Sequence, residues 1–428
     1  MKKLLFLGIN NRVLINSSLK LNYNIYSSSY FFTADTPKPN DKKNPYNERH
    51  FLKQIPNKSC GLFENQFTPD NIIKQSKEWI DKTDHIILNT GISPSYFKGN
   101  IKRKIIGNKN IENIENKYKF YKKTRNKYKL PLTFKLKNTN YTKNETENDK
   151  GNGNNNNNGN GNKDINMDMD ESIEIVKQYN DKQFLIKDLY GSGGYSIFFL
   201  NKEGTIEHFN NINGKIKQEF ILQEYIKGDN LSCSLLSSKD ESKAIVASKN
   251  FNNYEMEQFN QTKTNLNPEN KNIEKDFRYG GNIVPLDENE YGESILKDIY
   301  NTCEDLISDL KLIGSNGVDL ILNNGELNII EVNPRFQGTY ECVEEIYKIN
   351  LLKAHIDACN GELDKIKELS KAKCQCMKQI IYSNERTHFK GVNTINTKEN
   401  TSIYDIPHDY VFIEKNQPFL TLISKKIT

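Results

Sequence analysis

The sequence GVDLILNNGELNIIEVNPR occupies residues 317–335 and carries most of the structural interpretation. Two apolar runs lie on either side of residues 323–325, Asn-Asn-Gly. This arrangement is typical of a β-hairpin, because glycine readily takes the positive φ that a tight turn requires. Side chains alternate along a strand, so Glu331 and Asn333 lie on one face of the second strand.

The length of the loop decides whether Asp319 lies on the same face. A three-residue loop, residues 323–325, pairs Glu331 with Gly317 and places Asp319 beside Glu331 and Asn333. A two-residue loop turns Asp319 to the opposite face, because a shift of one residue reverses every side chain. The sequence leaves both registers open.

The chemistry of this hairpin indicates a metal site. Apolar residues surround Asp319 and Glu331, and an unpaired carboxylate in such surroundings costs several kcal/mol unless a cation offsets its charge. Two carboxylates and the Asn333 amide are hard oxygen donors, which suit Mg²⁺ and leave positions for water and nucleotide phosphates. The alternative is a structural salt bridge to Arg335.

A glycine-rich turn precedes the hairpin by more than a hundred residues. Lys187 ends one apolar strand, and Gly191, Ser192, Gly193 and Gly194 connect it to the next. Glycines let backbone N–H groups approach phosphate oxygens, and a nearby lysine adds a positive charge. No Gly-Lys-Ser/Thr follows, so this is not a Walker phosphate loop, and an ordinary glycine-rich hairpin is the alternative.

A third element is the sequence FILQEYIKGD at residues 220–229. It is a strand that breaks into a linker suited to join two lobes.

In this order the three elements resemble the ATP-grasp superfamily, and more narrowly the archaeal-type proteins described as predicted carboligases related to biotin carboxylase. The Glu-x-Asn-Pro-Arg sequence after Gly-x-Asp is the most specific part of the resemblance. Further segments that fit this subgroup are 8–12, 106–108, 116–117, 131–133, 278–285 and 405–407.

The resemblance implies a role for each candidate residue. Lys117 (or Lys119) and Lys187 would contact the nucleotide phosphates, and a lid over the phosphates would consist of Gly191, Ser192, Gly193 and Gly194. The residues that contact adenine would be Glu224, Tyr225 and Ile226, and Asp229 would lie near the ribose. Asp319, Glu331 and Asn333 would hold one or two Mg²⁺ (or Mn²⁺) ions. Arg335, with Arg278, would face an acyl phosphate.

The expected fold combines α/β and α+β architecture in three parts. Residues 1–110 alternate short apolar and polar runs, which predicts a Rossmann-like domain with a first strand at 4–9 and a helix at 13–21. A two-lobed ATP-grasp domain covers 111–360, with a helix at 111–128 and an Asn-rich insertion at 138–170 that we predict to be disordered. A small β-rich domain, which begins with a lysine-rich helix, covers 361–428.

The expected function is ATP-dependent carboxylate–amine ligation through an acyl phosphate, with release of ADP and phosphate. The partners would be a small carboxylic acid or amino acid and an amine, and the chain would be a monomer or homodimer. Two alternatives are an ATP-dependent carboxylase that uses carboxyphosphate and a non-catalytic ATP-binding regulatory protein.

Composition limits the other possibilities. The 428 residues carry a net charge of +5, too small to indicate a nucleic-acid binder. The basic stretch 98–143 is either a solvated face or the wall of an anion-attracting cleft. Seven scattered cysteines predict free thiols in a reducing compartment, and no apolar run approaches the ~20 residues of a membrane span, so we expect a cytoplasmic protein without membrane contact.

Overall fold

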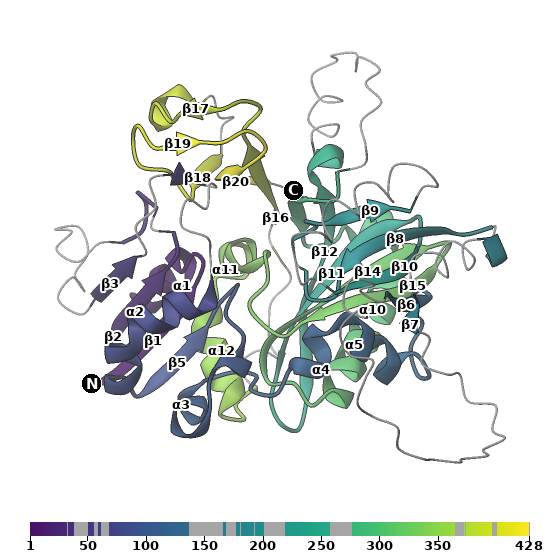
Figure 1. Cartoon of the computed structure of the whole chain (residues 1–428), viewed down its shortest axis with the longest axis horizontal. Helices are drawn as coiled ribbons and strands as arrows, with labels where there is room; N and C mark the ends of the chain where they lie inside the picture. Colours follow the sequence, from purple (N-terminus) through teal and green to yellow (C-terminus); the bar gives the residue numbers. More distant parts are fainter. Residues whose placement is uncertain are drawn as a thin grey trace, which may run out of the picture.

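A computed structural model shows the architecture of the chain (Figure 1). The residues that it describes are 1–31, 33–37, 50–54, 59–60, 68–136, 166–167, 177–179, 181–191, 193–200, 219–256, 276–363, 372, 374–395 and 400–427. Two sequence predictions therefore lie outside the described residues: most of the insertion at 138–170, of which only strand β7 (Asn166–Met167) is described, and the lysine-rich helix after residue 361.

The N-terminal part is a four-stranded parallel sheet with strand order β3-β2-β1-β5 (Figure 1). The first strand is completely buried from Leu4 to Leu7, as expected for a parallel sheet with packed faces. The predicted first strand and the helix that follows it are confirmed. The elements are β1 (Lys2–Gly8), α1 (Arg12–Ser18), β2 (Tyr23–Ser29), β3 (His50–Gln54), α2 (Pro69–Lys82), β5 (His85–Leu88), the 3-10 turn η2 (Pro94–Tyr96) and α3 (Gly99–Lys104).

The middle of the chain forms two lobes, each built on its own sheet. The smaller lobe has the strand order β7-β6-β10-β8-β9, with β6 (Thr133–Leu136), β8 (Gln183–Asp188), β9 (Ile197–Phe199) and β10 (Phe220–Tyr225). The larger lobe contains β11 (Asp229–Ser237), β12 (Ser242–Asn252), β13 (Tyr279–Val284), β14 (Gly314–Asn323) and β15 (Glu326–Asn333). Helices α9 (Glu288–Tyr291) and α10 (Glu293–Asp309) belong to this lobe, and α10 buries Ile299, Cys303 and Leu306 against its sheet.

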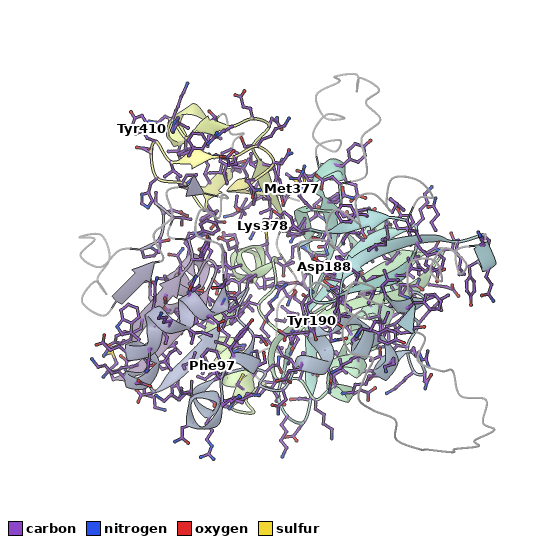
Figure 2. The ribbon with its side chains drawn as sticks, in the orientation of Figure 1. Phe97, Asp188, Tyr190, Met377, Lys378 and Tyr410 are labelled. Carbon is purple, nitrogen blue, oxygen red and sulfur yellow. The ribbon has the colours of Figure 1, made fainter. Side chains whose placement is uncertain are left out.

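The C-terminal strands continue the sheet of the larger lobe. Its full order is β15-β14-β11-β12-β13-β16-β20-β18, in which β16 (Cys374–Tyr382), β18 (Thr401–Tyr404) and β20 (Pro418–Ile427) come from the last part of the chain. A separate three-stranded sheet joins β17 (Thr387–His388) and β19 (Phe412–Ile413) to β4 (Ser59–Cys60) from the N-terminal part. Tyr410, 81% exposed, lies at the outer edge of this region (Figure 2).

The predicted helix at 111–128 is broken into two. Helices α4 (Glu112–Glu115) and α5 (Lys117–Thr124) meet at Asn116, whose side chain accepts a hydrogen bond from the backbone N–H of Lys119 at 2.9 Å. Asparagine is a favoured N-cap because its side-chain oxygen satisfies a free N–H of the first turn. The break starts a new helix axis at Lys117.

The N-terminal sheet shares a hydrophobic core with later elements. Leu4 and Phe6 of β1 belong to the same buried cluster as residues of α11 (Tyr340–Tyr347), α12 (Leu351–Cys359) and the C-terminal strands. The predicted mixed fold, in which sheets dominate, is therefore confirmed, with its parts packed on common apolar surfaces. Among the described residues, no helix is long and apolar enough to cross a membrane.

Candidate functional site

The hairpin at residues 314–333 brings the two predicted acids face to face. Its loop has two residues, because Asn323 pairs with Glu326, so the three-residue loop is wrong. A β-bulge at Ile330 then shifts the register, and Asp319 lies directly opposite Glu331 while Gly317 lies opposite Asn333. The bulge supplies the extra residue that the loop lacks, and it returns Asp319 to the face of Glu331.

The amide and the guanidinium that follow extend this pair into a chain of contacts. Asn333 Nδ2 donates to Asp319 Oδ2 at 2.8 Å, and Arg335 Nη2 donates to Asn333 Oδ1 at 3.0 Å. Arg335 is therefore linked to the acids through Asn333. The alternative of a direct salt bridge from Arg335 does not describe this geometry, since no ion pair of Arg335 occurs among the described residues.

Two lysines approach the acids from the smaller lobe and its linker. Lys117 Nζ lies 2.8 Å from Glu331 Oε2 and donates to the backbone carbonyl of Gly191 at 2.6 Å. Lys187 Nζ donates to Gln223 Oε1 at 2.8 Å, and Gln223 in turn donates to the Thr133 hydroxyl at 3.2 Å. The alternative Lys119 is exposed, and the capped turn at Asn116 explains why Lys117 points to the site instead.

Burial and charge separate the pKa values of these groups. Burial, followed by the charge of Glu331, raises the pKa of Asp319 to about 7. Burial also disfavours ionised Glu331, but Lys117, Lys187 and Arg335 outweigh it and lower the pKa of Glu331 to about 2. Burial lowers the pKa of Lys187 to about 8, with Glu331 acting in the opposite direction. The site therefore holds one firmly ionised carboxylate and one that ionises near neutral pH.

The donor set fits a magnesium ion. Two opposed carboxylates repel one another, and a divalent cation between them would remove that cost and lower the pKa of Asp319. Across the part of the chain that the structure describes, no group of three or more His, Cys, Asp or Glu side chains is placed to hold a metal. A site with two carboxylates and one amide suits Mg²⁺, which keeps several ligand positions for water and phosphate oxygens.

A cavity of about 460 Å³ lies between the lobes on one side of the acids. It is lined by the sheet of the smaller lobe, by Glu224, Tyr225 and Ile226 of the connecting strand, and by Asp319 and Glu331. The glycine turn covers one end: Gly193 and Gly194 have φ of 69° and 78°, and a Cβ on Gly194 would lie 1.8 Å from the Phe277 carbonyl. Ser192 lies outside the described residues. In Figure 2, Asp188 and Tyr190 mark the start of this turn near the middle of the molecule.

A second cavity, of about 640 Å³, lies on the other side of Glu331. Its walls come from the end of β5, from α4 and from residues 331–336. Lys117, Gly191 and Glu331 line both cavities, so the two spaces meet at Glu331. A nucleotide in the first cavity and a smaller substrate in the second would meet at Glu331.

Two predicted residues, Glu224 and Asp229, have contacts that point to other roles. The Glu224 carboxylate pairs with Lys182 and accepts a hydrogen bond from the Leu132 N–H at 3.1 Å. Asp229 lies 3.4 Å from Lys249 and accepts from Tyr291 Oη at 3.1 Å, whereas its neighbours Gly228 and Asn230 line the 460 Å³ cavity.

Arg278 lines none of the three cavities near the hairpin, whereas Arg335 lines two of them. Arg278 pairs with Asp276, donates to the Asn416 carbonyl at 2.6 Å and lies over the Tyr382 ring at 4.8 Å. These contacts fasten the C-terminal segment to the larger lobe. The structure therefore brings Lys117, Lys187, Asp319, Glu331, Asn333 and Arg335 together, but not Arg278.

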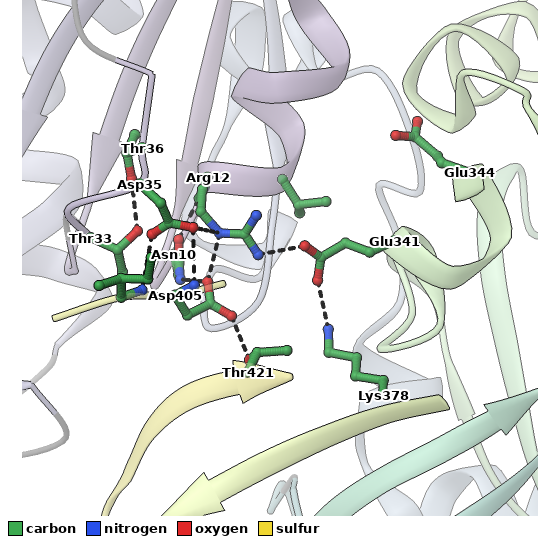
Figure 3. A network of polar contacts seen from close by, with 12 residues as sticks. Asn10, Arg12, Thr33, Asp35, Thr36, Glu341, Glu344, Lys378, Asp405 and Thr421 are labelled. Atoms are coloured by element: carbon green, nitrogen blue, oxygen red, sulfur yellow. Dashed lines mark hydrogen bonds and ion pairs between the residues drawn. The ribbon is translucent and has the colours of Figure 1, made fainter. Parts of the chain in front are cut away.

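Next to Arg335, a buried charge network connects three parts of the chain (Figure 3). Arg12, 3% exposed, lies 3.2 Å from Asp35, 2.5 Å from Glu341 and 2.8 Å from Asp405. Lys378 lies 3.0 Å from the second oxygen of Glu341. Arg12, Glu341, Lys378, Asp405 and Arg335 line a third cavity of about 210 Å³.

Sequence reasoning did not identify this network or Gln223. Residues 12 and 405 are 393 positions apart, and no local pattern signals a contact between them. The segments 8–12 and 405–407 fit the resemblance, but nothing in them predicts that they contact each other. The burial of Arg12 is seen only in the folded structure, where a buried arginine needs partners.

Comparisons with known proteins agree with this geometry. A family model described as "ATP-grasp domain" matches residues 114–339. An uncharacterized protein of Methanocaldococcus jannaschii is 26% identical over 429 residues, with 99% of this chain and 88% of that protein covered.

Solved structures share the fold at low identity. The biotin carboxylase domain of Hydrogenobacter thermophilus 2-oxoglutarate carboxylase, a dimer solved with MgADP, ADP and bicarbonate, has a TM-score of 0.66 at 12% identity and covers 100% of this chain and 87% of that one. N5-carboxyaminoimidazole ribonucleotide synthetase from Thermotoga maritima has a TM-score of 0.59 at 13% identity, with 100% and 94% covered. Biotin carboxylase from Campylobacter jejuni has a TM-score of 0.62 at 11% identity, with 99% and 87% covered.

Proposed function

The chain belongs to the ATP-grasp family of ATP-dependent ligases, and from this premise we propose that it joins a small carboxylic acid or amino acid to an amine. The observation that carries the proposal is the position of Glu331. It lies at the junction of two cavities, opposite Asp319 and in contact with Lys117. We also propose that the domain boundaries lie after residues 110 and 360.

The 460 Å³ cavity is the proposed ATP site. Lys117 and Lys187 supply positive charge beside the acids, where the phosphates would lie. Tyr225 and Ile226 line the part that would take adenine, and the turn at Gly193 and Gly194 would cover the phosphates. Glu224 would act there by fixing the strand through Lys182 and Leu132. For the ribose, Asn230 is a better placed residue than Asp229.

The acids Asp319 and Glu331, with Asn333, would hold Mg²⁺ (or Mn²⁺) between the two cavities. The bound ion would offset the negative charge that develops on the transferred phosphoryl group. Arg335 is oriented by Asn333 and the Phe336 carbonyl, and it lines the 640 Å³ cavity where the acid would bind. Its role is to pair with the carboxylate and then with the acyl phosphate.

The reaction needs ATP because a free carboxylate is a poor electrophile. Its oxygen attacks the γ-phosphorus, ADP leaves, and the acyl phosphate that forms has phosphate as a good leaving group. The amine then attacks the acyl carbon in the same cavity. Fixed positive charge from Arg335 and the lysines stabilises both steps, and no side-chain nucleophile takes part.

A carboxylase that uses carboxyphosphate is the second candidate. It is favoured by the neighbouring structure that contains MgADP and bicarbonate. In that reaction bicarbonate would take the place of the organic acid beside Arg335.

A phosphate-release screen tests the proposal and separates the candidates. Pools of amino acids, polyamines and small organic acids are combined in pairs with Mg²⁺-ATP, with and without bicarbonate, and Glu331→Gln is the negative control. Release that requires both an acid and an amine supports the ligase, and release that requires bicarbonate supports the carboxylase. Nucleotide binding without release under any combination would contradict both and favour a regulatory protein.

A further inference from the structure

A carboxyl group in the 640 Å³ cavity has no place in the reaction described so far. Glu115 ends helix α4, whose buried Ile114 holds the helix against the larger lobe. The Glu115 side chain lines the cavity together with Glu331, Asn333 and Arg335. It comes from helix α4, which precedes the smaller lobe in the chain and contacts β15 of the hairpin.

The partners of Glu115 leave its carboxylate available. Ser93 Oγ donates to Glu115 Oε2 at 2.7 Å, which orients the group. Within the described parts of the chain, Glu115 forms no ion pair within 4.0 Å. This differs from Asp319, Glu331 and Glu341, each of which has a close contact with a basic group or an amide of the site.

The surroundings make Glu115 a stronger base than an exposed glutamate. Burial raises its pKa, Ser93 acts against this, Glu112 on the same helix raises it, and Arg335 lowers it. Tyr96, from the turn η2, also faces Glu115. The net direction is upward, so the carboxylate holds a proton more readily than a solvated one.

The position of the cavity defines what can meet this carboxylate. An acyl phosphate formed between Glu331 and Arg335 would project into the 640 Å³ cavity, and an amine that attacks it must approach from the same space. The amine loses a proton when it becomes an amide. Besides Glu115, the described lining holds Glu112, which lies 3.6 Å from Lys102, and His355, whose ring nitrogens contact the Ser315 N–H and the Ile106 carbonyl. Outside the metal site, Glu115 is therefore the carboxylate of this lining that has no basic partner.

We propose that Glu115 is the general base of the amine step, a role that rests on the proposed ligase function. The amine nitrogen forms the new bond to the acyl carbon, and the bond between that carbon and the phosphate oxygen breaks. The electron pair of the broken bond leaves with the phosphate. The proton from nitrogen passes to the Glu115 carboxylate, and Ser93 keeps the carboxylate in place.

Glu115→Gln tests this role, because glutamine keeps the shape and can accept the Ser93 hydrogen bond but cannot take up the proton. Glu78→Gln is the control at a surface carboxylate outside the cavity, since Glu78 is 61% exposed and lies 2.5 Å from Lys82. Two acceptors are compared with Mg²⁺-ATP and the acid pools: the pool of amino acids and polyamines, and hydroxylamine. Hydroxylamine is neutral at pH 7 and captures acyl phosphates without a base.

The expected result for Glu115→Gln is a loss of about 100-fold in phosphate release with the amine pool, while hydroxamate formation stays within about twofold. The acidic limb of the pH profile for the amine reaction should disappear in this variant, and Glu78→Gln should behave like the wild type.

Three other outcomes have separate meanings. Unchanged amine-dependent release in Glu115→Gln, with the acidic limb intact, would overturn the base role and leave the ligase proposal standing. Equal loss with both acceptors in a folded variant would also overturn it, because Glu115 would then act in binding. No release from the wild type with either acceptor would overturn the ligase function and the base role with it.

Discussion

Asp319 and Glu331 lie directly opposite one another on neighbouring antiparallel strands, although the two-residue loop of their hairpin would on its own turn them to opposite faces. The β-bulge at Ile330 is responsible, since it adds one residue to the second strand. The pair is then neutralised unequally, with Lys117 close to Glu331 and Asn333 close to Asp319. This asymmetry has consequences that can be measured.

Asp319→Asn should stabilise the metal-free protein at alkaline pH. The pKa of Asp319 is raised from 3.8 to about 7, so the folded state holds a proton that the unfolded chain has already lost. Stability therefore falls as the pH rises from about 4 to about 7, and the variant avoids this loss. We expect a gain of about 2 kcal/mol in the free energy of unfolding at pH 8, measured by urea denaturation in EDTA.

The control for this prediction is Asp240→Asn, a change at an exposed aspartate. It should show no pH-dependent gain. If the wild type instead became more stable than Asp319→Asn as the pH rises, the pKa of Asp319 would not be raised in the metal-free protein.

Arg12→Met should strongly destabilise the protein. Arg12 is buried among Asp35, Glu341 and Asp405, and removal of its charge leaves these carboxylates without their main cation (Figure 3). Breaking a buried ion pair from one side costs about 3–5 kcal/mol, measured here as a lower free energy of unfolding.

The matched change at the surface is Arg386→Met. Arg386 is 65% exposed and lies 3.0 Å from Glu414, so its loss should cost less than about 1 kcal/mol. Similar costs for the two variants would mean that the Figure 3 network does not hold the parts of the chain together.

Gly194→Ala should impair nucleotide binding. The new Cβ would lie 1.8 Å from the Phe277 carbonyl, and the backbone φ of 78° is unfavourable for alanine. The turn must then move away from the strand that follows Phe277. We expect a destabilisation of about 1–3 kcal/mol and weaker ATP binding in calorimetry.

Gly292→Ala separates the effect of the backbone φ from the effect of the clash with the Phe277 carbonyl. Gly292 has a similar φ of 81°, but nothing lies within 4 Å of its Cβ position. It should lose about 1 kcal/mol of stability through backbone strain and bind ATP normally. Equal ATP affinity in both variants would show that the position of the glycine turn is unimportant for the nucleotide.

Local patterns were sufficient to predict the buried first strand and the hairpin, and metal binding by Asp319, Glu331 and Asn333 stays a prediction. They were insufficient for the register, because a bulge in the middle of a strand depends on how the hairpin packs between its neighbours. The sequence left both registers open, and the face that Asp319 and Glu331 share results from the bulge and not from a three-residue loop.

Long-range arrangement was the main part that the sequence left open. Strands β16 and β20 extend the sheet of the larger lobe, which depends on pairing with β13 far back in the chain. Arg278 is basic and precedes a strand, but its choice of Asp276 and Tyr382 follows from tertiary packing. Local periodicity does not predict these contacts, because they depend on which elements pack together in the folded chain.

The central claim is that Asp319, Glu331 and Asn333 bind a divalent ion together with ATP. Electron paramagnetic resonance of Mn²⁺, titrated in the presence of ATP, measures this without knowledge of the other substrates. Glu331→Gln is compared with Glu326→Gln, a change on the same strand at a residue that is 67% exposed and pairs with Lys129. We predict that Glu331→Gln weakens ATP-dependent Mn²⁺ binding more than about 10-fold while the fold is retained, and that Glu326→Gln binds like the wild type. Equal Mn²⁺ titrations for a folded Glu331→Gln and the wild type would contradict the claim.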